Sequence, residues 1–282
     1  MNHYLIPDDF LIETDSKEGI HIHHYHSTYE YKKNRVTLKT NAFSFLLKGY
    51  KNLLYNGHQS ENIEPREFIF MKSGNYLMSE KLTEENEYHS ILLFFDNQFL
   101  ASFVLKYAHH FPKKEKSSTV VIKGQIDNYI SHFLESLQFI EASDRIAKTI
   151  KLEELFLYLI QHQNLNIKDL LNEQNQNEQF KIQEVIHNNW RSNLQVSELA
   201  FLCNMSISSF KRHFEHIYHC SPVKWIQKKR LEYAAEQLLQ SSNRANDIYL
   251  EMGYQSLSSF IQAFKQNYGM TPKQYQKHNL DV

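Results

Sequence analysis

Hydroxyl, amide and basic side chains lie on one face of two predicted helices in the C-terminal third of the chain. Arginine and lysine pair with guanine, glutamine pairs with adenine, and serine reaches either base. These residue types therefore suit contact with base edges and phosphates of DNA, although on a lone helix the same pattern usually marks a solvated face. The positions are Ser208, Ser209, Lys211, Arg212 and His216 on the first helix, and Ser258, Ser259, Gln262 and Lys265 on the second.

The two helices belong to a repeat with an offset of fifty residues. Two copies of one unit indicate a duplicated supersecondary structure rather than a solenoid. Apolar residues recur within each copy at the spacing of one helical stripe. The duplication favours the DNA-binding interpretation of both faces. The residues that recur unchanged are Ser206, Ser208, Ser209, Phe210, Phe214, Tyr218 and Pro222, as Ser256, Ser258, Ser259, Phe260, Phe264, Tyr268 and Pro272.

Each repeat has the pattern of a helix-turn-helix motif. Ser206 and Ser256 are placed to cap the first turn of the longer helix. A shorter helix precedes each serine and ends at Asn204 or Gly253, residue types that tolerate a left-handed backbone. A short helix, a turn and a longer helix define the motif. Two such helices on one rigid connector could enter successive major grooves about 34 Å apart. The motifs span residues 196–217 and 246–268.

With these motifs, residues 180–282 resemble the DNA-binding domain of the AraC/XylS family of bacterial transcription regulators. The resemblance implies seven helices, with a long connecting helix over residues 222–240. It also implies binding to double-stranded promoter DNA and to RNA polymerase, more in the manner of an activator than of a repressor. Implied base contacts come from Ser208, Lys211, Arg212, Ser258, Ser259 and Gln262. The matching positions include Leu199-Ala200, Ser221-Pro222, Gly253-Tyr254, Phe264-Lys265 and Thr271-Pro272.

The sequence departs from the family pattern at two positions that bear on DNA reading. The longer helix of each motif, which would contact the bases, is called its reading helix. His219 replaces the glycine that usually ends the first reading helix, which predicts a strained or differently shaped turn. Gln262 replaces an arginine that contacts bases in many members, so we expect the second helix to read DNA more weakly than the first.

Composition predicts a two-domain protein that is not an enzyme. The chain has 282 residues, of which 41% are apolar, enough for two cores. It lacks a run of 18 apolar residues near its start and a signal-peptide pattern, which predicts a cytoplasmic protein without membrane contact. Its seven glycines and the absence of nucleophile motifs leave little material for a nucleotide site or cofactor.

Cysteine and charge usage agree with this class. Cys203 and Cys220 give no disulfide framework, and Cys203 lies on an apolar stripe that predicts core packing. From residue 178 onward the chain holds 12 Lys and Arg against 9 Asp and Glu, a net charge of +3. The first 177 residues hold 19 against 23, so the excess positive charge lies in the half that is predicted to meet phosphates.

The first 125 residues have the pattern of an antiparallel β structure. Short apolar runs at 43–49, 68–71 and 88–95 are separated by turn signals. The family resemblance implies that this segment is a cupin-like β-barrel, the regulatory domain. Two helices are predicted over 126–141 and 146–162 within a helical segment that ends at 171. We expect them to form a dimerisation hairpin and a homodimer; the alternative is that both helices simply cover the barrel. The predicted fold is thus α+β and multidomain, with a polar linker at 172–179.

The regulatory half also resembles a subgroup of the family, the activators of type III secretion typified by ExsA. The resemblance rests on residues 43–81, 97–103 and 150–155. It implies an N-terminal domain that self-associates and binds a protein anti-activator. A small apolar or acidic ligand in the barrel stays open as an alternative. Aromatic residues that could line such a pocket are Phe43, Phe45, Phe68, Phe70, Phe94 and Phe95.

A histidine cluster supports a rival hypothesis from another class of protein. His24, His26 and Glu30 resemble part of the metal-binding motif of cupin enzymes. On a strand, His24 and His26 would share one face, as metal ligands require. A metal-binding cupin enzyme or sensor fused to a DNA-binding module would follow. The flanking glycines do not match the motif, so we expect a histidine-rich surface strand and no metal.

Overall fold

The chain folds into two compact units. One comprises residues 1–55 and 60–175, and the other the chain from 176 onward. Residues 172–177 of the predicted linker at 172–179 lie outside the described residues. Residues 178 and 179 begin the first helix of the second unit. The structure, a computed structural model, describes residues 3–10, 19–55, 60–107, 121–163, 165, 178–240 and 244–280.

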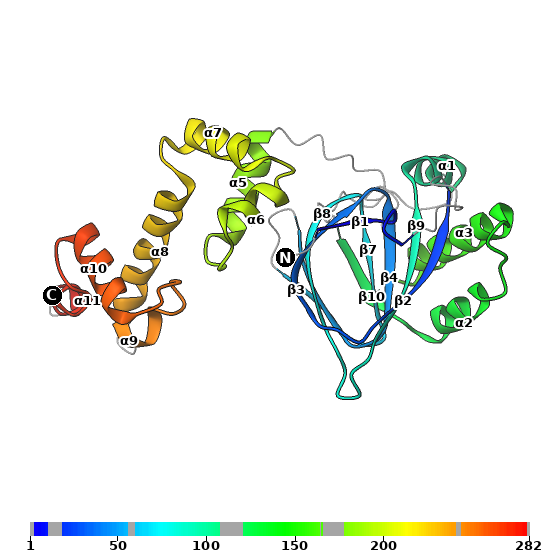
Figure 1. Ribbon diagram of the computed structural model, residues 1–282, viewed down its shortest axis with the longest axis horizontal. Coiled ribbons are helices and arrows are strands. Elements are labelled where there is room, and N and C mark those ends of the chain that lie inside the picture. The colour runs from blue at the N-terminus through cyan, green and yellow to red at the C-terminus, as the bar shows by residue number, and fades with distance from the viewer. Residues whose placement is uncertain are drawn as a thin grey trace. The chain divides into compact units, whose positions relative to one another are not determined.

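The first unit contains two five-stranded sheets (Figure 1). All pairings are antiparallel except that of β1 with β3. Among the described residues the two sheets are not hydrogen-bonded into one closed barrel, so the predicted barrel is an open two-sheet structure. One sheet has the order β1 (His3–Ile6), β3 (Tyr31–Leu38), β8 (Gly74–Lys81), β5 (Tyr50–Tyr55) and β6 (Glu61–Ile63). The other has the order β10 (Val121–Gln125), β7 (Glu67–Met71), β4 (Asn41–Lys48), β9 (Tyr88–Phe95) and β2 (His21–Ser27).

The inner strands β7, β4 and β9 of the second sheet are buried on both faces, which explains their continuous apolar runs. Alternate residues of β4 point to opposite faces. Ala42 and Leu46 pack in the core between the sheets, whereas Phe43 and Phe45 pack in a core with the helices. Most of the phenylalanines considered for a barrel pocket face these helices; the exception is Phe94, which lies in the core between the sheets.

Three helices cover the outer face of this sheet, at the right of Figure 1. Leu152, Phe156 and Ile160 of α3 are buried in the core of their own domain, so the apolar second face of this helix covers the sheet. The sequence of this helix is apolar on more than one face, including Leu152, Phe156 and Ile160, and this pattern favoured the dimerisation hairpin. The burial of these three residues in their own domain removes that reason. The sequence did not predict α1, which lies in the segment interpreted as mainly β. The helices are α1 (Asn97–Tyr107), α2 (Asn128–Leu137) and α3 (Arg145–His162).

The second unit is helical, with seven helices over the described residues 178–240 and 244–280, as the family resemblance implies. The two helix-turn-helix motifs are α6 with α7 and α9 with α10 (Figure 1). Between them runs α8, the connector that was predicted over 222–240. The helices are α5 (Glu178–Asn189), α6 (Val196–Leu202), α7 (Ile207–Tyr218), α8 (Pro222–Leu238), α9 (Ala245–Ile248), α10 (Leu257–Tyr268) and α11 (Pro272–Leu280).

Candidate nucleic-acid interface

Both reading helices begin at the predicted serine caps. The Ser206 hydroxyl accepts a hydrogen bond from the Ser209 amide at 3.1 Å, and the Ser256 hydroxyl accepts one from the Ser259 amide at 3.2 Å. Each bond satisfies one of the free amides in the first turn of a helix. The two helices therefore start at equivalent positions of the repeat, which fixes the same rotational phase for α7 and α10.

Apolar residues hold each reading helix by its inner face. Phe210 and Phe214 of α7, like Phe260 and Phe264 of α10, are fully buried. The aromatic contacts of the two copies also correspond. The Tyr218 ring lies 4.9 Å from the Trp225 ring of α8, between ring centroids, and the corresponding distance from Tyr268 to Tyr275 of α11 is 5.2 Å. Each reading helix is thus packed against the helix that follows it.

With the inner faces buried, the predicted DNA-contacting residues point outward. Ser209 is half-buried and follows the cap, whereas the other candidates on both helices are exposed. The Ser259 hydroxyl donates a hydrogen bond to the Ser256 carbonyl at 2.8 Å, so this side chain serves the cap as well. The exposed candidates are Ser208, Lys211, Arg212, His216, Ser258, Ser259, Gln262 and Lys265.

The turns have the backbone geometry that the sequence predicts. Asn204 and Gly253 adopt positive φ angles of 60° and 79° between the two helices of their motifs. His219 ends α7 in the left-handed conformation with φ of 55°, the same conformation that Gly269 adopts after α10 with φ of 76°. The replacement of glycine by His219 therefore leaves the shape of the turn unchanged. It puts a side chain in a left-handed conformation that is unfavourable for most residues with a Cβ atom.

Cys203 belongs to the scaffold of the first motif. Its side chain is buried, and burial raises the pKa of the thiol to about 12. A thiol with so high a pKa is not a nucleophile at neutral pH, because the thiolate is the reactive form. The predicted core role of Cys203 is confirmed.

One inward-facing arginine was missed by sequence reasoning. Arg230 follows Lys228 and Lys229 in α8 and looks like part of a solvated basic run. Its guanidinium instead donates hydrogen bonds to backbone carbonyls outside α8. Composition and periodicity carry no signal for this role, because backbone carbonyls accept such bonds whatever their side chains.

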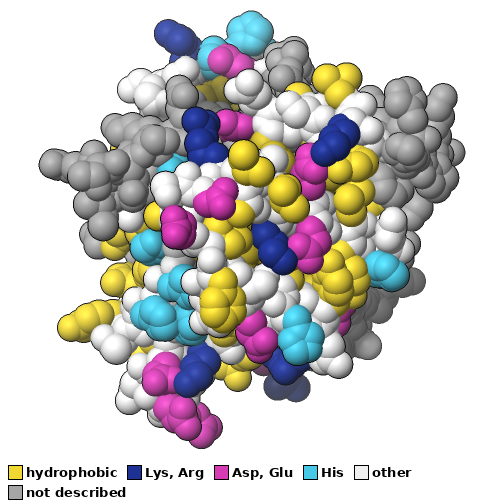
Figure 2. All heavy atoms as spheres, turned by 90° about the vertical axis from the view of Figure 1, so that its right-hand side faces the viewer, with side chains coloured by type: hydrophobic (Ala, Val, Ile, Leu, Met, Phe, Trp, Pro, Cys, Tyr) yellow, Lys and Arg dark blue, Asp and Glu magenta, His cyan; other side chains and the backbone are white. Residues whose placement is uncertain are grey.

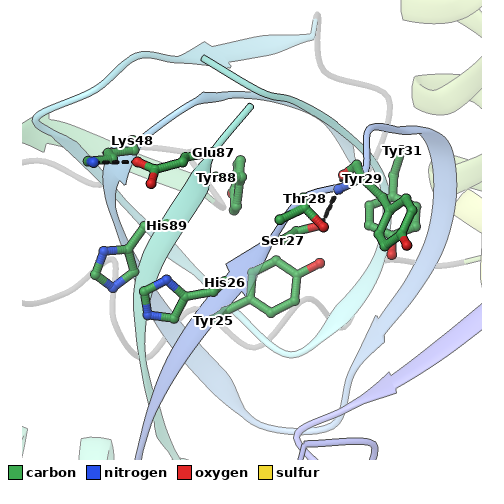
Figure 3. Close-up of a pocket in the computed structure, with 10 residues that line it drawn as sticks. All are labelled: Tyr25, His26, Ser27, Thr28, Tyr29, Tyr31, Lys48, Glu87, Tyr88 and His89. Carbon is green, nitrogen blue, oxygen red and sulfur yellow. Dashed lines mark hydrogen bonds and ion pairs between the residues drawn. The ribbon is translucent and has the colours of Figure 1, made fainter. Parts of the chain in front are cut away.

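The histidine cluster lies on the edge strand β2, as predicted, but its third member is not Glu30. His24 and His26 are two residues apart on β2 and so point to the same side of it. His89 of the neighbouring strand stacks on His26 with 3.8 Å between ring centroids (Figure 3). Glu30 instead accepts a hydrogen bond from the Leu82 amide. Within the described ranges, no three His, Cys, Asp or Glu side chains are arranged to hold a metal ion.

A surface pocket of about 440 Å³ lies beside this histidine pair (Figure 3). Tyrosine rings line one side of it, and the ion pair of Lys48 with Glu87 lines the other. Burial, and then repulsion from His26 and His24, lowers the pKa of His89 to about 4. At neutral pH the His89 ring is therefore uncharged.

A second cavity, of about 170 Å³, lies between the two sheets and is mainly apolar. The exceptions include Lys51 and Glu80, whose charged atoms are 3.7 Å apart. Lys51 also donates a hydrogen bond to Ser44, and Tyr25 donates one to Glu80. Burial lowers the pKa of Lys51, while Glu80 opposes the change. A small, largely apolar molecule with one polar group fits the chemistry of this cavity.

Comparison with known families identifies both halves of the chain. Residues 199–278 match the family described as a helix-turn-helix domain, and residues 41–170 match the ExsA N-terminal regulatory domain. In the part of the chain that is described, no helix has the length and apolar character to span a membrane.

Three curated relatives align over most of the chain. The virulence regulon transcriptional activator VirF of Yersinia enterocolitica is 24% identical over 226 residues, which cover 78% of this chain and 83% of VirF. The transcriptional regulator ExsA of Pseudomonas aeruginosa is 24% identical, with 74% and 77% covered. The thermoregulatory protein LcrF of Yersinia pestis is 25% identical, with 81% and 86% covered.

A solved structure also aligns along the length of the chain. The ToxT protein of Vibrio cholerae, with a bound unsaturated fatty acid, has a TM-score of 0.40 and 15% identity, and the alignment covers 94% of this chain and 97% of ToxT.

Proposed function

Because this chain is a DNA-binding transcription regulator of the AraC family with an ExsA-type regulatory domain, we propose that it activates transcription from a promoter site read jointly by α7 and α10. The observation that carries the proposal is the repeated cap. Two helices of equal phase, each buried on one face, present polar and basic residues outward. Such helices suit successive major grooves of one asymmetric site.

Base contacts are assigned by residue type. Arg212 and Lys211 suit guanine, Gln262 suits adenine, and Ser208 and Ser258 suit several bases. His216 and Lys265 stand one helical turn further along and suit phosphates. The arginine and lysine of α7 have no counterpart of equal charge on the first turns of α10. The first half of the site therefore contributes more to sequence discrimination than the second.

The test of this proposal is selection of DNA sites by the purified full chain from a random pool. We expect a site with two preferred half-sites about 10 base pairs apart, because one helical turn separates successive major grooves. A promoter carrying that site should drive a reporter gene when the protein is supplied with bacterial RNA polymerase, which is its proposed partner in the cytoplasm. A selected site without base preference would contradict the proposal.

Dimerisation is proposed through exposed residues of the two helices that the sequence suggested, rather than through the buried Leu152, Phe156 and Ile160. Ile146 and Ile150 lie one turn apart on α3, and their side chains are 74% and 58% exposed. Phe139, after α2, is 82% exposed. Figure 2 shows the side of the unit that carries α1, α2 and α3, where hydrophobic side chains lie among charged ones. A pair of exposed isoleucines on one helix suits a self-complementary contact between two copies.

Sedimentation of the full chain tests this contact. We expect a dimer for the natural sequence and a monomer for the variant with Ile146→Glu and Ile150→Glu. Leu105→Glu is a matched control, because Leu105 of α1 is 79% exposed but lies on another helix. A dimer that persists in the double variant would refute the assignment.

The effector of the regulatory domain is proposed to be either a protein partner or a small molecule in the cavity between the sheets. The cavity and its buried Lys51 favour a small ligand with an acidic or carbonyl group. Native mass spectrometry of the untagged protein separates the alternatives. An organic mass that is lost on denaturation would support the small ligand, whereas a bare protein would favour the protein partner. An added mass equal to that of a metal ion would instead support the rival hypothesis of a metal-binding cupin enzyme or sensor.

A further inference from the structure

The guanidinium of Arg230 joins three backbone carbonyls that come from both halves of the helical unit. Its Nε donates to the Trp190 carbonyl at 2.9 Å, and its Nη2 donates to the Ser192 carbonyl at 2.7 Å. Both acceptors lie in the connection between α5 and α6, just before the first motif. Its Nη1 donates to the Met252 carbonyl at 3.4 Å, in the turn between α9 and α10 of the second motif.

The acceptors lie in two well-packed parts of the helical unit. Met252 is buried in the apolar core that α8, α9 and α10 share. On the other side, the Trp190 ring packs edge-on against Tyr233 of α8 at 5.7 Å, and the Arg191 guanidinium lies 3.9 Å from the centroid of the same Tyr233 ring. The carbonyls that Arg230 joins are therefore fixed to rigid elements rather than to free ends.

The second motif leaves room for this guanidinium only because position 253 is glycine. A Cβ atom on Gly253 would lie 2.3 Å from Nη1 of Arg230. Any larger residue would displace the guanidinium of Arg230 and break its hydrogen bond with the Met252 carbonyl. Gly253 thus has two roles, the left-handed turn that the sequence predicts and the approach of Arg230, which it does not.

We propose that Arg230 is a positioning residue that sets the angle between the two helix-turn-helix motifs, so that α7 and α10 engage both half-sites of one DNA site at a fixed spacing. The inference rests on the proposed two-helix reading of DNA. The planar guanidinium is suited to this role, because its five N–H donors point in fixed directions. Lysine keeps the charge but presents its donors from a single atom, so it cannot join carbonyls on both sides.

The spacing of the half-sites gives a measurement that a merely stabilising residue would not affect. One inserted base pair rotates one half-site by about 34° relative to the other. If the angle between the motifs is fixed, the natural protein must lose contacts at one half-site. We expect a loss of affinity of about tenfold or more, which corresponds to roughly one lost base-pair contact. A variant in which the angle between the motifs is no longer fixed can follow the rotation, so it loses less affinity on the insertion.

The experiment compares the full chain with three variants on the selected site and on the same site with one inserted base pair. In Arg230→Lys and Gly253→Ala, the penalty for the insertion should shrink to roughly threefold or less, while affinity for the unaltered site also falls. Gly269→Ala is the matched control. Gly269 also has a positive φ, of 76°, but a Cβ atom there meets nothing within 4 Å. The inserted base pair should therefore cost Gly269→Ala as much affinity as it costs the natural protein.

Circular dichroism at the binding temperature ensures that only folded variants are compared. An unchanged insertion penalty in folded Arg230→Lys and Gly253→Ala would overturn the positioning role of Arg230 and leave the two-helix reading intact. A natural protein that tolerates the insertion, or a selected site with one half-site only, would instead overturn the two-helix reading and the inference with it.

Discussion

At the level of single residues, Arg212 is the side chain on which specific binding depends most. It is exposed on the outward face of α7, and arginine forms two hydrogen bonds with guanine. We expect Arg212→Ala to weaken binding to the selected site by about 1–3 kcal/mol and to relax the base preference at one position. Gel-shift titration against the selected site and its single-base variants measures both effects.

Two controls define what the Arg212 result means. Lys229→Ala removes one positive charge from α8, where Lys229 pairs with Glu232, and should change affinity much less. A uniform loss across unrelated sequences would show that Arg212 contacts phosphate rather than a base, because phosphate contacts carry no sequence information.

His89 makes the stability of the regulatory domain depend on pH. Its pKa is about 4 in the folded protein and about 6.5 when the ring is free. Between these values the unfolded chain binds more protons, so the free energy of unfolding falls as the pH drops from 6.5 towards 4. Because His89 is only partly buried, water screens part of the effect, and we expect a contribution of about 1 kcal/mol rather than the full shift.

The substitution His89→Gln should flatten this dependence. Thermal unfolding of the first unit, followed between pH 7 and pH 5, should show a smaller fall in Tm for the variant than for the natural protein. His132→Gln is the control, because His132 is 80% exposed on α2 of the same unit. Equal slopes for His89→Gln and the natural protein would show that protonation of another group, such as His23, dominates.

At the level of elements, the end of α7 carries a conformational cost that the end of α10 avoids. A left-handed residue with a Cβ atom is about 1–2 kcal/mol less favourable than glycine. We therefore expect His219→Gly to stabilise the second unit by about 1 kcal/mol, since glycine loses part of this gain through its freedom in the unfolded chain. Urea denaturation measures the change. The reverse substitution, Gly269→His, should destabilise by a similar amount; a stabilising effect there would contradict the argument.

The reading helices were predictable from sequence because their signals are local. Ser206 and Ser256 cap their helices through bonds that span three residues, and the buried phenylalanines follow one helical stripe. The strand order of the first unit was not predictable in this way. β4 is buried on both faces, so its sequence has no alternation that would tell the face towards the helices from the face towards the other sheet.

The candidate site likewise has residues that local sequence predicts and contacts that it does not predict. Its exposed residues, Lys211 and Arg212 among them, follow from periodicity and from the repeat. The hydrogen bonds of Arg230 depend on three carbonyls that are 40, 38 and 22 residues away in sequence. Nothing in the acceptor residues' types identifies such contacts, so only the fold brings them together.

At the level of the whole molecule, the apolar cores that the described residues form in the two units do not share residues. Those of the first unit contain residues up to 165, and one core of the second unit is built from α8, α9, α10 and Tyr275 of α11. We therefore expect residues 178–282 to fold alone and to bind a single selected site with nearly the affinity of the full chain, because all proposed base contacts lie within this fragment.

Two adjacent sites should distinguish the fragment from the full chain. If the first unit dimerises through Ile146 and Ile150, binding of one copy raises the effective concentration of the other, and affinity for the paired sites should exceed that of the fragment by about 100-fold. The full-length double variant Ile146→Glu and Ile150→Glu should behave as the fragment does, since it keeps every DNA contact and loses only the link between copies. Cooperative binding by the fragment would instead place the contact between copies in the helical unit.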